Sequence, residues 1–213
     1  MSERITRQAM KALRAGRKAD AVVLLEQAAA DDPVAANQLG AMFEHGEHVA
    51  QDDARARELY RHAADKGFAL AQFNLGFLLH MGRGGDADRE RARHWYGKAA
   101  DQGEPTALLN LGILLARGEG GPRDVAAGYA LWERAAQAGE PMAAFNLGMV
   151  HAGGHDVPVD FVKALAWFRR AYTMGHPQAV AECAKVRGVM TAEEIAAADA
   201  LASHDKAQRE ALS

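Results

Sequence analysis

A single 36-residue period runs through most of this 213-residue chain, and it constrains the fold more than any other feature. The dipeptide Leu-Gly occurs four times at this step: Leu39-Gly40, Leu75-Gly76, Leu111-Gly112 and Leu147-Gly148. Three further columns keep the same phase: Gly46, Gly82, Gly118 and Gly154; Asp52, Asp88, Asp124 and Asp160; Gly67, Gly103, Gly139 and Gly175. A fixed period of this length predicts an array of similar small units, each of which buries its apolar face against the next.

The composition indicates that these units are helical. Alanine accounts for 47 residues, whereas valine, isoleucine and threonine together account for only 19. Alanine is the strongest helix former, and the β-branched residues are the ones that strands prefer. The composition therefore predicts an all-α fold class and argues against a β-sandwich or barrel.

We predict that each unit is a pair of helices. In the first unit, one helix spans about residues 35–45 and ends at Gly46, which can adopt the left-handed conformation that closes a helix. Asp52 is a natural N-cap for the second helix, which ends near Gly67. The second helices carry bulky pairs at Leu59-Tyr60, Trp95-Tyr96, Leu131-Trp132 and Trp167-Phe168. Proline is expected to begin the next helix in three cases, at Pro105, Pro141 and Pro177.

These residues closely resemble the Sel-one-like repeat family, the longer-looped relatives of tetratricopeptide repeats. The pattern that carries the resemblance is A-x-x-N-L-G-x-x-x-x-x-G followed by D-x-x-x-A-x-x-W-Y/F-x-x-A-A-x-x-G, and residues 71–103 display it best. The resemblance implies a right-handed α-solenoid of antiparallel helix pairs. It also implies an adaptor that binds other proteins or peptides on its concave surface.

The repeats leave a segment at each end. Residues 1–34 are predicted to form an N-terminal helical hairpin, a degenerate repeat in which Gly16 separates two helices. Thr191 and Glu194 have the spacing of a capping box that opens a last helix. The predicted boundaries are 1–34 for the hairpin, 35–70, 71–106, 107–142 and 143–178 for the four repeats, 179–206 for the C-terminal capping helices and 207–213 for a tail.

The candidate binding site lies on the first helix of each repeat, because in a tetratricopeptide-like unit this helix lines the inner groove. The asparagine before Leu-Gly can pair with both the N–H and the C=O of a bound peptide backbone. Aromatic and aliphatic residues flank it at helical spacing. The predicted partner-binding residues are Asn37, Gln38, Phe73, Asn74, Phe77, Leu109, Asn110, Ile113, Phe145, Asn146 and Met149.

Two alternatives remain open for this surface. The apolar residues can instead pack against adjacent helices while the amides bond neighbouring backbone, since apolar positions at helical spacing are usually core. The last helix, with Ile195 and Leu201, can also fold back into the groove and occupy it.

Catalytic chemistry has little support in the sequence. The three serines, Ser2, Ser203 and Ser213, lie at the ends of the chain, so no repeat carries a serine nucleophile. The alternative is an enzyme, a metal-dependent hydrolase. Its candidate metal ligands are His151, His155 and Asp156, or His45 and His48. Neither group has an HExxH or CxxC pattern, and we predict no metal and no cofactor. Cys183 occupies a column that is otherwise leucine, so we expect it to be a small core residue.

Charge and hydropathy limit the partners. The formal net charge is −3, the glycine clusters precede aspartate caps rather than a phosphate-binding lysine, and no stretch is apolar enough to span a membrane. We therefore expect a cytoplasmic protein that binds a protein or peptide and neither nucleic acid nor membrane. Residues 1–20 carry a charge of +4 and residues 192–213 a charge of −3. A monomer is favoured, with head-to-tail association into a self-assembling structural solenoid as the alternative.

Overall fold

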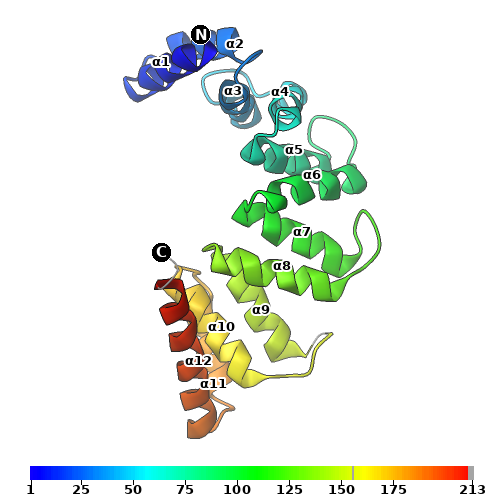
Figure 1. Cartoon of the computed structure of the whole chain (residues 1–213), viewed down its shortest axis with the longest axis vertical. Coiled ribbons are helices and arrows are strands. Elements are labelled where there is room, and N and C mark those ends of the chain that lie inside the picture. Colours follow the sequence, from blue (N-terminus) through cyan, green and yellow to red (C-terminus); the bar gives the residue numbers. More distant parts are fainter. Residues whose placement is uncertain (155, 211–213) are drawn as a thin grey trace. The chain divides into compact units, whose positions relative to one another are not determined.

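The computed structural model describes the backbone of residues 1–154 and 156–210 and the side chains of residues 1–154 and 156–202. Over this part of the chain every regular element is a helix (Figure 1). The helices are α1 (Ser2–Arg14), α2 (Lys18–Ala28), α3 (Pro33–His45), α4 (Asp53–Asp65), α5 (Ala69–Met81), α6 (Arg89–Asp101), α7 (Pro105–Arg117), α8 (Val125–Gln137), α9 (Pro141–Gly153), α10 (Phe161–Thr173), α11 (Ala179–Arg187) and α12 (Ala192–Glu210). The predicted all-α repeat fold is confirmed.

The chain divides into two compact units. Unit 1 comprises Met1–Ala107 and Glu119–Gly121, and unit 2 comprises Leu108–Gly118 and Pro122–Ser213. Within the units, α3, α5, α7 and α9 are the first helices of the repeats, and we call them helices A. Their successors α4, α6, α8 and α10 are helices B.

The predicted aspartate and glycine caps of the helices are confirmed. The carboxylates of Asp52, Asp88, Asp124 and Asp160 each accept a hydrogen bond of 2.9 Å from a backbone N–H in the first turn of their helix B. The glycines that follow the helices A have φ between 66° and 70°. Helix α3 begins at Pro33, two residues before the predicted start, because the Asp32 carboxylate accepts from the Val34 N–H and caps it there.

Proline begins two of the three predicted helices. Pro105 and Pro141 are the first residues of α7 and α9. The prediction for Pro177 is wrong, since this residue lies in a turn and α11 begins only at Ala179. Here the Phe145 and His176 rings stack 4.1 Å apart, which holds the chain in an extra turn before the helix starts.

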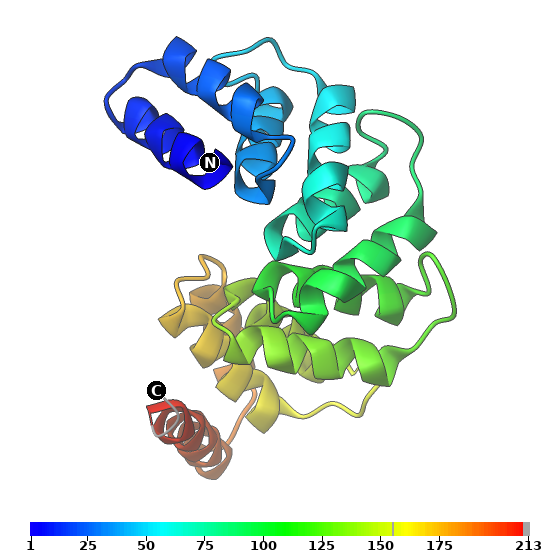
Figure 2. The same ribbon diagram turned by 45° about the horizontal axis from the view of Figure 1, so that its top comes forward.

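The two ends of the array are capped by helices. Helices α1 and α2 lie side by side as the N-terminal hairpin, with Gly16 at φ 73° between them (Figure 2). At the C-terminus the Thr191 and Glu194 capping box is present, each residue bonding the backbone N–H of the other. Ala198 and Ile195 of α12 pack against the apolar cluster around Phe168 of α10. Figure 1 shows α12 beside α10. Through residue 202, α12 therefore covers the last helix pair, which contradicts the alternative in which it folds back along helix A.

The glycine of each Leu-Gly dipeptide packs against an aromatic ring of the helix B that follows. The pairs are Gly40 with Tyr60, Gly76 with Tyr96, Gly112 with Trp132, and Gly148 with Phe168. A Cβ on Gly148 would lie 2.5 Å from the Phe168 ring, closer than carbon atoms approach without strain. Because these positions are glycine, helix A packs directly against a buried ring of helix B. This contact determines which side of helix A faces helix B.

A partly buried ion network joins the first repeat to the loop of the second. Arg83 donates to the Asp53 carboxylate at 2.7 and 3.0 Å and to the Glu44 carboxylate at 2.7 Å. The Tyr60 hydroxyl donates to the other oxygen of Glu44 at 2.7 Å. The Glu44 side chain is only 8% exposed, so it depends on these donors for solvation.

The next junction carries a related set of contacts in which the acidic and basic side chains have exchanged positions. Thirty-six residues after Glu44, Asp53 and Arg83 stand His80, Arg89 and Glu119. The Glu119 carboxylate lies 3.3 Å from His80 Nε2 and 3.2 Å from Arg89 Nε. The positions of the acid and of the bases are thus reversed. The Tyr60–Glu44 hydrogen bond has no counterpart here, because the hydroxyl of the equivalent Tyr96 is buried without a partner among the described residues.

The first junction should respond to pH through Asp53. Its hydrogen bonds from Arg83 hold the pKa of the Asp53 carboxyl below its ordinary value, so the stability that this carboxylate contributes is present at neutral pH and is lost as the pH falls below about 4. Asp53→Asn is expected to lower the free energy of unfolding by about 1 kcal/mol at pH 6 and by much less at pH 3. Urea unfolding at both pH values checks this; an equal loss at both would contradict it.

Candidate functional site

One side of each helix A is turned away from its helix B. In unit 1 this side is formed by residues spaced four, three and four apart, which share one face of a helix. They are Val34, Gln38, Ala41 and His45 on α3, and Leu70, Asn74, Phe77 and Met81 on α5. In unit 2 the same positions are Asn110, Ile113 and Arg117 on α7, and Met142, Asn146 and Met149 on α9. We call these residues the outward stripe; none of them is buried.

The rotation of helix A explains why this face is outward. The glycine of Leu-Gly points at the ring of helix B, and each residue turns the helix by about 100°. On α5, the stripe positions consequently lie about 100–160° around the helix from Gly76. Phe73 lies only about 60° from it and remains on the side of helix B.

Seven of the eleven predicted site residues belong to the outward stripe. They are Gln38, Asn74, Phe77, Asn110, Ile113, Asn146 and Met149. The structure thus brings four of the five predicted amides, and one of the two predicted apolar columns, onto a common face within each unit.

The other four predicted residues, Asn37, Phe73, Leu109 and Phe145, pack inward. The Phe73 ring centre lies 5.8 Å from that of Tyr96, and the Phe145 ring centre lies 5.5 Å from that of Phe168. Leu109 is 7% exposed, and its carbonyl accepts a hydrogen bond of 3.0 Å from Trp132 Nε1. Phe73, Leu109 and Phe145 therefore pack against adjacent helices, as the alternative stated for these apolar residues expects.

The amides divide between internal and outward roles. Asn74 Nδ2 donates to Oδ1 of the buried Asn37 at 3.0 Å and so links α5 to α3. Asn146 is partly exposed on α9, where its side chain makes no hydrogen bond with the described part of the chain. Its donors and acceptor are thus available to a backbone laid along the stripe.

Sequence reasoning missed the ends of the outward stripe. Val34, Leu70, Met81 and Met142 are 42–58% exposed although they are large and apolar. Their four-three-four spacing with the asparagines is the signal that could have found them. The stripe also carries the cationic or titratable side chains of His45 and Arg117, and none of its members is acidic.

In unit 2 the stripe borders an apolar hollow. Met149, Val150, Ala152 and Gly153 of α9, together with Glu182 of α11, line a cavity of about 320 Å³. Met149 is 45% exposed at its edge. An apolar hollow next to exposed methionine is a surface that can accept a hydrophobic side chain, since methionine adapts its shape to a partner.

The histidines are not gathered into a metal site among the described residues, where no three His, Cys, Asp or Glu side chains cluster as ligands. Burial lowers the pKa of His151, which lies near the end of α9. His155, the second histidine proposed for this loop, lies outside the described residues. The structure therefore adds no support to a metal-dependent hydrolase.

Cys183 packs against the apolar cluster around Phe168. Burial raises the pKa of its thiol, which leaves less of the reactive thiolate at neutral pH. Both observations agree with a packing role for this cysteine. No helix of the described chain has the length and apolar character needed to cross a membrane.

The hairpins, their aspartate caps and the glycine–aromatic contacts define an all-α repeat protein. Four consecutive matches to the Sel1 repeat cover residues 33–68, 69–104, 105–140 and 141–176. The chain belongs to the Sel1 repeat family. The matched repeats begin two residues before the boundaries that we predicted, at the helix starts that the structure shows.

Solved structures support the same assignment. The chain is similar to a Sel1 repeat protein from Oxalobacter formigenes, with 26% identity and a TM-score of 0.80 over 94% of this chain and 84% of that one. It is also similar to c5321, a protective antigen of uropathogenic Escherichia coli with an SLR fold, at 25% identity and a TM-score of 0.54, over 87% of this chain and 48% of that one. The immunity protein Pa5087 from Pseudomonas aeruginosa shares the fold, at 18% identity and a TM-score of 0.54, over 98% of this chain and 83% of that one. A search of curated proteins found no match.

Proposed function

We propose that this protein is a non-catalytic interaction scaffold whose outward stripe binds a partner protein. Sel1 repeat proteins are generally non-catalytic scaffolds for protein–protein interaction, and that general role is the starting point. The observation that carries the finer proposal is the outward stripe itself, where each helix A carries an amide beside at least one large apolar side chain that is not buried. Apolar residues of this size are rarely left together on a surface that has no partner.

The partner's chemistry follows from the stripe. Phe77, Ile113 and Met149 offer apolar contacts, and the Asn146 side chain offers both donors and an acceptor. A hydrophobic peptide segment or an amphipathic helix satisfies both requirements. The protein acts in the cytoplasm as a monomer in this proposal.

A triple variant tests the stripe. Phe77→Ala, Ile113→Ala and Met149→Ala remove one apolar side chain from each of α5, α7 and α9 and are expected to reduce partner recovery from native lysate by about tenfold or more. The matched control replaces three exposed valines outside the stripe, Val159, Val180 and Val189, by alanine.

Circular dichroism and thermal unfolding establish that both triple variants are folded before recovery is compared. The control is expected to recover partners as the wild type does. Equal recovery by the stripe variant and the wild type would overturn the proposed surface, and turnover of a small molecule without any specific partner would overturn the scaffold role.

A further inference from the structure

Unit 1 contains a pocket of about 310 Å³ that lies apart from the outward stripe. Helices α4, α5 and α6 all contribute to it, so it opens between the helices B of the first two repeats. Leu75 and Leu79 of α5 form its apolar floor, and both are buried. The indole of Trp95 on α6 forms one wall and is partly buried.

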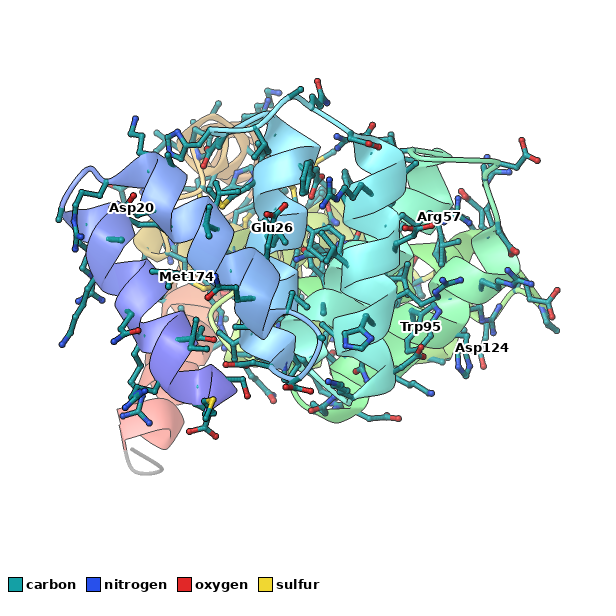
Figure 3. All side chains as sticks on the ribbon, turned by 90° about the horizontal axis from the view of Figure 1, so that it is seen from above. Asp20, Glu26, Arg57, Trp95, Asp124 and Met174 are labelled. Atoms are coloured by element: carbon teal, nitrogen blue, oxygen red, sulfur yellow. The ribbon has the colours of Figure 1, made fainter. Side chains whose placement is uncertain are left out.

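Three guanidinium groups line the same pocket. Arg57 and Arg61 come from successive turns of α4, and Arg91 comes from α6. A single carboxylate, that of Glu58, also lines it, so the lining has an excess of two positive charges. Figure 3 labels Arg57 of α4 and Trp95 of α6, two of the residues that line the pocket.

The three guanidinium groups make few hydrogen bonds or ion pairs within the described part of the chain. Arg61 makes no hydrogen bond or ion pair with the described part of the chain. Arg91 Nε lies 3.3 Å from an Asp88 oxygen, and Arg57 Nη1 lies 3.4 Å from the Asp86 carbonyl. Each guanidinium has five N–H donors, so these long contacts leave most donors unused.

The repeats themselves indicate that the fold does not require these side chains. Thirty-six residues after Arg61, Arg91 and Trp95 stand Gly97, Ala127 and Leu131. The aspartate caps and the Leu-Gly glycines, by contrast, recur in every repeat. The next junction lacks this combination of arginines and tryptophan, so we treat the pocket as a feature added to a common framework.

We propose that this pocket binds a small organic anion in which an oxyanion group is attached directly to a flat apolar ring. Arginine forks match the oxygens of phosphate and carboxylate groups, which lysine does not do as specifically. The ring would lie against Trp95 above the leucine floor. A volume of about 310 Å³ is at the small end for ligand pockets and suits a single ring.

Calorimetric titration of the full chain tests the proposal with phenyl phosphate, benzoate and inorganic phosphate. Phenyl phosphate or benzoate is expected to bind saturably with a Kd below about 1 mM. Inorganic phosphate is expected to bind at least about tenfold more weakly, because it cannot use the indole or the leucine floor. Whichever aryl anion binds more tightly identifies the oxyanion that the arginines prefer.

The test variants carry residues that stand at the equivalent positions of other repeats, so we expect these variants to fold. Arg61→Glu with Arg91→Ala, and separately Trp95→Leu, introduce residues that positions 133, 127 and 131 already carry. Each is expected to weaken binding of the aryl anion at least about tenfold. The control, Arg4→Glu with Lys11→Ala on α1, makes the same change in net charge and should leave the Kd unchanged.

Four results would overturn the proposal. They are the absence of saturable binding of both aryl anions up to about 10 mM, equal affinity for inorganic phosphate, wild-type affinity in folded pocket variants, and an equal loss in the α1 control. The last of these would show that net charge alone attracts the anion.

Discussion

Replacing Arg83 by methionine is expected to lower the free energy of unfolding by about 2–3 kcal/mol, which is large for one partly exposed residue. Methionine keeps most of the length of the side chain but removes every donor. The Glu44 carboxylate, 8% exposed, then loses its cationic partner while it remains inside the junction. Removing one member of a buried pair costs more than the pair contributes, because the remaining charge is left without solvation.

Chemical unfolding in urea measures this loss, with Arg4→Met on α1 as the control. Arg4 is exposed and has no ionic partner among the described residues, so its replacement should change the stability by less than about 0.5 kcal/mol. A second variant carries Glu44→His, Asp53→Arg and Arg83→Glu together and so copies the second junction. This triple variant should recover at least half of the loss; a loss equal to that of Arg83→Met would contradict the exchange of charges between junctions.

Replacing Gly148 by alanine is expected to lower the free energy of unfolding by about 2–3 kcal/mol. The new Cβ would lie 2.5 Å from the ring of Phe168, which is fully buried and cannot retreat. Helices α9 and α10 would have to separate, and that separation costs packing along both.

The control is the same substitution at Gly97, which is inside α6. A Cβ there would meet no atom within 4 Å. Because alanine favours helix over glycine, Gly97→Ala should raise the free energy of unfolding by about 0.5–1 kcal/mol. Thermal and urea unfolding of both variants check the opposite signs; a stabilised Gly148→Ala would contradict the proposed helix contact.

Most of the fold could be predicted from the sequence because its determinants are local and repeated. Asp52 caps the helix that directly follows it, and Gly46 closes the helix that directly precedes it, so each role is visible within a few residues. The repeated columns predict the start of α3 two residues too late, because the cap formed by Asp32 lies outside them. Pro177 was misplaced because the ring contact of His176, made by Phe145 thirty-one residues earlier, has no local signal.

The Leu-Gly glycine was recognised as a column, but its packing role was not. Its contact is made with a ring twenty residues further along the chain, as for Gly76 and Tyr96. This contact also sets the rotation of helix A. Without it, the sequence could not separate Phe77, which faces outward, from Phe73, which packs on Tyr96.

The sequence of a single repeat does not reveal the ion network or the anion pocket, because each is formed by residues of two successive repeats. Arg83 meets residues of the previous repeat, and Arg91 shares a pocket with Arg57 and Arg61 from another helix. Such sites depend on how successive units stack, which the 36-residue period implies only in outline. The boundaries of the predicted segments and the right-handed sense of the array remain predictions.

Site-specific photo-crosslinking tests most directly whether the outward stripe binds a partner. A benzophenone amino acid is placed at Phe77 or Met149 in the stripe, or at the exposed Ala130 of α8, and the cells are irradiated. We predict a discrete crosslinked species from position 77 and from position 149, and none from position 130. Crosslinks from position 130 of equal yield, or none from either stripe position, would contradict the account.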